Sequence, residues 1–387
     1  MTVVQEKDAI PRLQHLVPHM RDQLLRMRQP ANFEQLRFRY IDTVDRLVIE
    51  GKGRRTASRV GDRDAYWAPT TEVLTEAMRL GFVQRQPLPS ARRYLDTYRD
   101  RHYLLTEEGA ALADVAEVDS AAFYDAITEA VYAAHPYFRR LVDLLTLEPL
   151  LCPEVSEGDV EDARRQRKAL FHWTEYALEV IGGRSLLSRE EASSIISAAV
   201  TRRFKGERPS GKALAETLND AFATVAASAR GLPIGATDLN ILRQWGMQLR
   251  LLDQSRYVPG YSGTNVIWLA ADIDETRKPS LRRRGLSENL SRAADAVLQA
   301  YRDFTAAADT SLAAPYAPIY TIRAAAAFQC GLTRTLIDMV IERLADGSLP
   351  NQTHRLLLHL GTTHQPASEP LFRRGGSRRY EMTVHKA

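Results

Sequence analysis

Hydrophobic residues near the carboxyl end of the chain recur first at helical spacing and then at strand spacing. The helical pattern predicts a helix with one buried face that ends at Gly347. Its apolar residues lie at i, i+3, i+4 and i+8: Leu336, Met339, Val340 and Leu344. Two extended runs follow, at 354–361 and 378–386, and glycines and prolines separate them. The pattern predicts a helix followed by a β-hairpin with a long tip.

The same order of elements is predicted near the amino end. Helical periodicity favours helices over 35–51 and 69–80, and Gly81 ends the second of them. The residues expected to face the core in the second helix are Val73, Leu74, Ala77 and Leu80. A short strand is expected at 82–84, and a strand at 102–105 leads into Thr106, the predicted N-cap of a closing helix.

These two stretches resemble winged helix-turn-helix domains. In the first, a helix ends at LGFV and a later strand runs into LTEEGAALA. In the second, a short helix over 319–330 precedes a helix that opens near Thr333 and the hairpin. The resemblance implies a recognition helix, which is 70–80 in the first stretch, and a hairpin that acts as a wing.

Between these ends the periodicity predicts a bundle of helices. A helix is expected over 161–181, where Gly182 and Gly183 end it, and Ser188 with Glu191 forms a predicted capping box for the next one. A further helix is expected to start near Ser210, and Thr237 is the predicted cap of the next one. The resulting fold class is mainly α, with two winged-helix modules flanking the bundle. The predicted divisions are a lead-in helix at 1–34, a winged helix at 35–118, the bundle at 119–256, a linker with a long helix at 257–316, and a second winged helix at 317–387.

Composition limits the class of protein. A chain of 387 residues with 44% hydrophobic and 26% charged residues has enough apolar surface for more than one core. No apolar run approaches the roughly 20 residues of a membrane span, and the first residues lack the apolar region of a signal peptide. Cys152 and Cys330 lie far apart without a metal-ligand motif. A cytoplasmic protein without a membrane partner is expected.

Positive charge is concentrated at three places. The last 41 residues carry six Lys or Arg against two Glu, and a second cluster lies at 277–292 and a third in the first predicted wing. Basic hairpin tips are typical of phosphate contacts, although a charge run can also be a solvated face. The residues expected to contact DNA are Thr71, Thr75, Arg79, Arg85, Arg92, Arg93, Arg99, Arg101, Arg334, Arg373, Arg374, Arg378 and Arg379.

Three patterns approach catalytic or metal-binding chemistry. GERPSGKA at 206–213 has the spacing of a phosphate-binding loop, but Ala213 replaces the hydroxyl residue and helical sequence precedes it. Asp272 and Asp274 form an acidic cluster beside an apolar run, which leaves a metal-dependent nuclease as an alternative. His354 and His359 would alternate across a strand and face opposite sides. No catalytic residue, metal site or cofactor is therefore expected.

The function expected from these patterns is binding without catalysis. A winged-helix subunit would bind DNA, or link DNA to protein partners, in a multi-protein machine for antiviral defence or DNA processing. The layout also resembles the kleisin subunits of bacterial condensin-like complexes, whose end domains bind an ATPase partner. That kleisin-like role is the first alternative, and a transcriptional repressor or the nuclease follows it.

Overall fold

The protein is mainly helical, as the periodicity predicts, with 64% of the chain in helices and 14% in strands. The computed structural model describes residues 10, 13, 15–50, 66–86, 102–168, 170–182, 185–274, 280–307, 316–349, 354–360, 372–374, 377–379 and 381–386. The helices are α1 (Leu16–Arg26), α2 (Phe33–Ile49), α3 (Trp67–Arg79), α4 (Glu107–Val118), α5 (Ser120–Ala134), α6 (Pro136–Leu147), α7 (Glu157–Arg165), α8 (Leu170–Ile181), α9 (Arg189–Phe204), α10 (Gly211–Ala229), α11 (Ala236–Gln248), α12 (Leu286–Ala307), α13 (Ile319–Cys330) and α14 (Arg334–Asp346).

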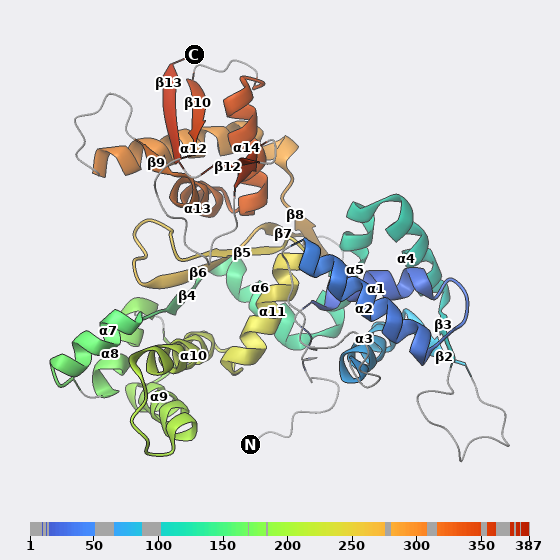
Figure 1. Ribbon diagram of the computed structural model, residues 1–387, viewed down its shortest axis with the longest axis horizontal. Helices are drawn as coiled ribbons and strands as arrows, with labels where there is room; N and C mark the ends of the chain where they lie inside the picture. Colours follow the sequence, from blue (N-terminus) through green and yellow to red (C-terminus); the bar gives the residue numbers. More distant parts are fainter. Residues whose placement is uncertain are drawn as a thin grey trace. The chain divides into compact units, whose positions relative to one another are not determined.

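The strands are short and antiparallel (Figure 1). They are β1 (Ala31–Asn32), β2 (Val83–Arg85), β3 (His102–Leu105), β4 (Leu150–Pro153), β5 (Leu252–Ser255), β6 (Thr264–Leu269), β7 (Ala271–Asp274), β8 (Ser280–Arg283), β9 (Ala317–Pro318), β10 (His354–His359), β11 (Arg373–Arg374), β12 (Ser377–Arg378) and β13 (Glu381–Lys386). The chain divides into two compact units, Met1–Arg140 with Asn240–Leu249, and Leu141–Leu239 with Arg250–Ala387.

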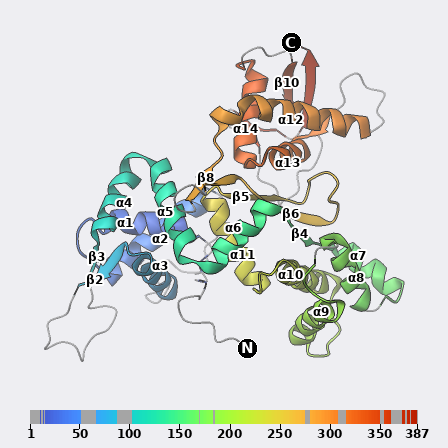
Figure 2. The ribbon, with the colours of Figure 1, turned by 180° about the vertical axis from the view of Figure 1, so that it is seen from behind.

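The first unit contains an N-terminal module, which consists of α1, β1, α2, α3, β2, β3 and α4. Its sheet has the order β1-β3-β2, and Figure 2 shows β2 and β3 beside α3 and α4. The lead-in helix α1 packs on α2, α3 and α4, so it belongs to this module. Its buried His19 stacks on Tyr40 with ring centroids 3.8 Å apart, and burial lowers the pKa of His19 to about 3.

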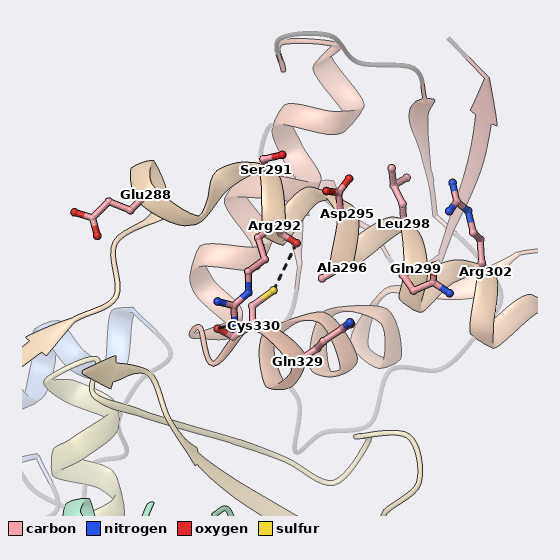
Figure 3. A pocket seen from close by; sticks show the side chains of 10 residues that line it. All are labelled: Glu288, Ser291, Arg292, Asp295, Ala296, Leu298, Gln299, Arg302, Gln329 and Cys330. Carbon is pink, nitrogen blue, oxygen red and sulfur yellow. Dashed lines mark hydrogen bonds between the residues drawn. The ribbon is translucent and has the colours of Figure 1, made fainter. Parts of the chain in front are cut away.

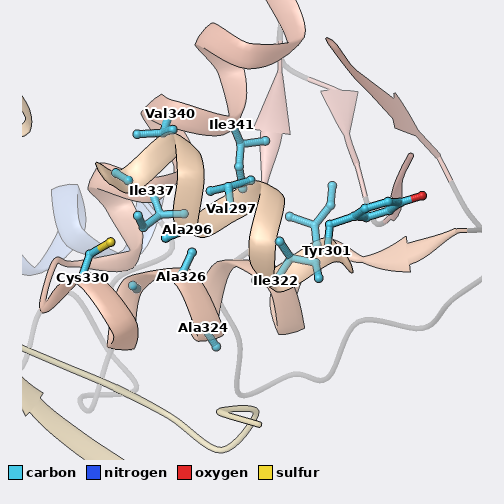
Figure 4. Packing of buried hydrophobic residues seen from close by; sticks show 14 of the residues in the cluster. Ala296, Val297, Tyr301, Ile322, Ala324, Ala326, Cys330, Ile337, Val340 and Ile341 are labelled. Atoms are coloured by element: carbon cyan, nitrogen blue, oxygen red, sulfur yellow. The ribbon is translucent and has the colours of Figure 1, made fainter. Parts of the chain in front are cut away.

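The second unit contains a C-terminal module, which consists of α12, β9, α13, α14, β10 and β13. Its sheet has the order β10-β13-β9. The apolar core joins α12 to α13 and α14 through a cluster that includes Val297, Tyr301, Ile322, Ile337 and Val340 (Figure 4). The expected division of α12 from the module, at residue 317, does not fit this packing, because the cut would pass through the core.

A three-stranded sheet of order β4-β6-β5 lies in the second unit, and the apolar run 265–274, whose sequence suits a buried strand or the start of a helix, supplies most of β6. Every residue of β6 is buried. The indole nitrogen of Trp268 donates to the carbonyl of Leu332 at 2.9 Å, and Trp268 belongs to the core of the C-terminal module. The sheet and the C-terminal module therefore share one core, so the part of the predicted linker at 257–273 belongs to a packed structure.

The remaining helices of the second unit, α7 to α10, pack around Trp173, Ala177, Ile196, Leu218 and Phe222. The expected single helix over 161–181 is wrong, since the chain breaks between α7 and α8 with Arg167 at a φ of 52°. The capping box at Ser188 and the helix start near Ser210 are confirmed. The last helix of the predicted bundle opens at Ala236, so Thr237, its expected cap, lies inside its first turn.

Candidate nucleic-acid interface

Two sequence segments that carry the N-terminal resemblance contact each other directly. Thr106 caps α4, as predicted, by accepting a hydrogen bond from the backbone N–H of Gly109 at 3.0 Å. The Thr106 hydroxyl donates to the carbonyl of Gly81 at 2.6 Å, and its N–H donates to the carbonyl of Phe82 at 3.1 Å. Gly109 lies so close that a Cβ atom there would come within 1.9 Å of the Phe82 oxygen. These contacts fix the end of α3 and the start of β2.

The outward face of α3 is the one that the periodicity predicts. Val73, Leu74 and Ala77 are buried, and Thr75 is exposed. The side chains of Thr71 and Arg79 are partly exposed, and Glu72 shares this face. The expectation about which residues face the core is confirmed here. Leu80, also predicted to face inward, lies at the helix end and is only half-buried.

One charged residue of α3 belongs to the core, which the periodicity does not predict. Glu76 is buried and hydrogen-bonds to His135, whose ring packs edge-on against Trp245. Arg79, a predicted DNA contact, has its guanidinium 3.9 Å from the Glu76 carboxylate. The sequence holds no signal for this pair, because its members are 59 residues apart. It attaches α3 to the N-terminus of α6 and limits how far Arg79 can act as an independent cation.

Arg334 does not lie where a DNA contact requires. The side chain is buried at the N-terminus of α14, where its Nε donates to Asp253 at 3.0 Å. The Arg334 backbone N–H also donates to the same carboxylate, at 2.5 Å. A guanidinium held this way neutralises a buried aspartate and is not available to a phosphate. The expectation for Arg334 is corrected accordingly: it fastens α14 to β5.

A second buried arginine of the C-terminal module lies next to this pair. Arg323 of α13 is 1% exposed and donates to both carboxylate oxygens of Asp338 at 3.3 Å. Burial raises the pKa of Asp338 to about 6, against the opposing effect of Arg323. Some of the arginines that the sequence suggests as surface charges therefore lie in the interior of the protein.

The outward face of α14 differs in charge from that of α3. Thr335, Met339, Arg343 and Asp346 are exposed, and Glu342 is partly exposed. Met339 is 42% exposed, so its predicted place on the buried face is wrong. With Arg343 as its single cation among these residues, this face does not carry the positive charge that favours the phosphate backbone.

Two of the predicted DNA contacts on the hairpins are exposed and a third is partly exposed. Arg85 at the end of β2 and Arg378 in β12 are exposed, and Arg379 is half-buried. The Nε of Arg379 has no hydrogen-bond partner among the described residues. The backbone of Arg373 pairs with that of Arg378 across the β11-β12 ladder. Arg92, Arg93, Arg99 and Arg101 lie outside the described residues, as do the side chains of Arg373 and Arg374.

A groove of about 800 Å³ lies along α12 and the end of α13 (Figure 3). Two arginines and two carboxylates line it: Glu288, Arg292, Asp295 and Arg302. The Arg292 guanidinium donates to the carbonyl of Cys330 at 2.8 Å, where it caps α13, and the Cys330 thiol donates to the carbonyl of Arg292. With its charges balanced and one arginine engaged, the groove is not an anion site.

The residues in the sequence patterns that resemble catalytic or metal-binding motifs make other contacts in the structure. GERPSGKA connects α9 with α10, as predicted, and a Cβ on Gly211 would come within 2.3 Å of the Glu161 carboxylate, so an acid occupies the place of a phosphate. Asp272 accepts two hydrogen bonds from Arg284, at 2.9 and 2.8 Å. The side chain of Asp274 lies outside the described residues. Among the residues that the structure describes, no group of three or more His, Cys, Asp or Glu could hold a metal ion.

Comparisons of the chain with protein-family models, with curated proteins and with solved structures find no match. In the described ranges no single helix is long and apolar enough to cross a membrane. The bent pair α13 and α14 passes that test jointly, with a bend of 114° between them.

Proposed function

We propose that the protein is a non-catalytic subunit that binds DNA, or joins DNA to protein partners, through two winged-helix modules. The observation that carries the proposal is the repeated element order. Each module has a helix, a two-residue strand, two further helices and two longer strands, and the last strand of each lies between the other two. A DNA-handling machine, such as an antiviral defence complex, is the setting that we propose for such a subunit.

The connection between α13 and α14 supports this proposal. The chain turns by 114° there, within three residues that begin with Gly331. Helix-turn-helix motifs join two helices at about 90–120° by a turn of three or four residues that often contains glycine. Gly331 has a φ of 59°, a value that glycine adopts without strain. The turn is thus of the kind that presents a second helix to a groove.

In this proposal the two modules differ in the charge of their outward helix faces. Exposed arginines also lie on the hairpins, at Arg85 and Arg378, where contacts to phosphate would fix position without reading sequence. The hydroxyl-bearing face of α3 is compatible with a groove, whereas the face of α14 carries Glu342 and Asp346. We therefore propose sequence-independent binding through the wings, with α3 as the better candidate for a recognition helix.

The same difference in charge favours a second candidate function. An acidic face with exposed Met339 is better suited to a protein surface than to DNA. In a kleisin-like subunit, the C-terminal module would dock on a protein partner such as an ATPase, while the N-terminal module serves a separate contact. This alternative predicts that the hairpin arginines contribute little to DNA affinity.

The experiment that separates the two is a salt titration of DNA binding. Changing the four hairpin arginines, Arg373, Arg374, Arg378 and Arg379, to alanine removes candidate phosphate contacts. Each phosphate that the protein no longer neutralises lowers the slope of log K against log salt by about 0.9 on duplex DNA, so removing two such arginine–phosphate pairs lowers it by about 2. Affinity should fall equally on unrelated sequences.

A matched control removes four positive charges elsewhere. The exposed residues Arg202, Arg203, Arg208 and Lys212 lie in or between α9 and α10, outside both modules. Their replacement by alanine should leave the slope near that of the unchanged protein. An unchanged affinity and slope in the hairpin variant would reject the wing as a DNA contact and favour the kleisin-like role.

A further inference from the structure

The two modules correspond residue by residue through their second helices. Each second helix directly follows the first strand of its sheet, which begins with a fully buried alanine, Ala31 or Ala317. The buried residues that follow match in spacing: Phe33 with Ile319, Leu36 with Ile322, and Arg37 with Arg323. A buried arginine at the same position in both helices makes the correspondence specific. α2 and α13 can therefore be compared face by face.

In the C-terminal module, the outer face of α13 is covered. Tyr320 meets Tyr257 with ring centroids 4.8 Å apart, and Phe328 meets Tyr261 at 5.6 Å and Trp268 at 5.7 Å. Ala324, between them on the helix, has no exposed surface. The covering side chains come from β6 and from the segment that joins it to β5. In this copy of the module, an aromatic-bearing pair of strands packs on the second helix.

In the N-terminal module, the corresponding face of α2 is exposed. Phe38 stands at the position of Ala324 and is 58% exposed, and Asp42 stands at the position of Phe328 and is exposed. Ile49 continues the face and is 86% exposed. The outer face of α2 thus exposes two apolar residues and an acidic one, where the other module has an aromatic contact. We call Phe38, Asp42 and Ile49 the α2 stripe.

We propose that the α2 stripe is a docking surface for a segment of another protein that carries aromatic and basic side chains. Aromatic groups fit because they fill the equivalent place on α13 and because Phe38 offers a ring to pack against. Basic groups fit because the exposed Asp42 lies between the apolar residues of the stripe.

Charge excludes two other occupants. A two-fold contact centred on the stripe would bring Asp42 of one copy of the chain against Asp42 of the other, which like charges oppose. DNA would meet the same repulsion from its phosphates. The α2 stripe therefore favours a basic protein partner, whether or not the hairpins bind DNA.

The test uses the full-length protein with a photo-crosslinking phenylalanine analogue, p-benzoylphenylalanine, in place of Phe38. The reference position is Phe171 in α8, an aromatic residue of similar exposure at 49%. Irradiation in the native cells, followed by mass spectrometry, should map the crosslink at position 38 to a segment of one other protein with an aromatic residue and lysines or arginines. Asp42→Lys should lower the crosslink yield by about tenfold or more, since like-charge contacts cost several kcal/mol.

A second variant keeps the result interpretable. Because Phe38 contributes little to the core, Phe38→Ala should melt at the temperature of the unchanged protein and still lose the partner. Crosslinks to the chain's own residues or to a second copy would overturn the proposal. So would a yield no greater than at Phe171, a mapped segment without basic or aromatic residues, or a yield that Asp42→Lys leaves unchanged.

Discussion

Replacing Gly109 by alanine should destabilise the first unit, although the same change normally stabilises a helix. An alanine in a helix interior is about 1 kcal/mol better than glycine. At this position, however, the new Cβ would come 1.9 Å from the carbonyl oxygen of Phe82, far inside contact distance. Overpacking of this kind costs about 1–3 kcal/mol. Backbone rather than a flexible side chain is the obstacle, so relief requires α4 or the end of α3 to shift.

The shift also weakens a hydrogen bond. The Phe82 carbonyl accepts the N–H of Thr106 at 3.1 Å, and such a bond contributes about 1 kcal/mol. The helix preference of alanine offsets part of these two costs. We therefore expect the free energy of unfolding to fall by about 1–3 kcal/mol. Hydrogen exchange measured by mass spectrometry reports this locally. Peptides from β3 and α4 should exchange about 5 to 150 times faster, and peptides from α10 should not change.

Gly158 supplies the matched control. It lies in the first turn of α7, and the nearest atom to a Cβ there is the Ser156 hydroxyl at an ordinary 3.5 Å. Gly158→Ala should leave protection unchanged or raise stability by up to about 1 kcal/mol. If Gly109→Ala proved as stable as Gly158→Ala, the close contact between the LGFV and LTEEG segments would be wrong. The position of the end of α3 against α4 would then be wrong as well.

Three further outcomes test the packing. Leu74 is 1% exposed, so Leu74→Ala should lower the free energy of unfolding by about 2–5 kcal/mol. A loss under about half a kilocalorie would mean that the face of α3 assigned to the core is wrong. Deleting 317–387 should leave a fragment that aggregates, because the apolar face of α12 becomes exposed. Deleting 286–387 removes α12 as well, so this shorter fragment should aggregate less. If the two fragments were equally soluble, α12 would not be part of the C-terminal module. Burial lowers the pKa of His19 to about 3, so the unfolded chain binds more protons below pH 6.5 and stability should fall with pH by about 3 kcal/mol between pH 6.5 and 4. In urea titrations this fall should be smaller in His19→Phe, which keeps a ring on Tyr40, and an equal fall in both proteins would contradict the assignment.

Elements with local signals could be predicted from the sequence. The helix over 319–330 has the predicted bounds, and the N-caps at Thr106 and Ser188 hold the predicted hydrogen bonds. A capping side chain and the N–H groups that it satisfies lie within three residues, so the sequence contains the whole interaction. Strand β3 at 102–105 also has the predicted bounds.

Breaks and pairings without local signals could not be predicted. The break between α7 and α8 has Arg167 in a left-handed conformation that usually calls for glycine, so nothing in the composition marks it. Strand β4 at 150–153 pairs with β6 at 264–269, more than a hundred residues later. A pairing over that distance depends on the fold of everything between, which periodicity does not describe.

Charge shows the same limit most clearly at the candidate site. The sequence counts every arginine as a positive surface charge, yet Arg37, Arg323 and Arg334 are buried with acidic partners. Arg282 and Arg284 of the second basic cluster also form ion pairs. The electrostatic case for DNA therefore rests on the two hairpins. Because each phosphate contact contributes about 0.9 to the salt slope, the four arginines of the C-terminal hairpin can account for at most about 3.6 of it, and any larger slope must come from other basic residues.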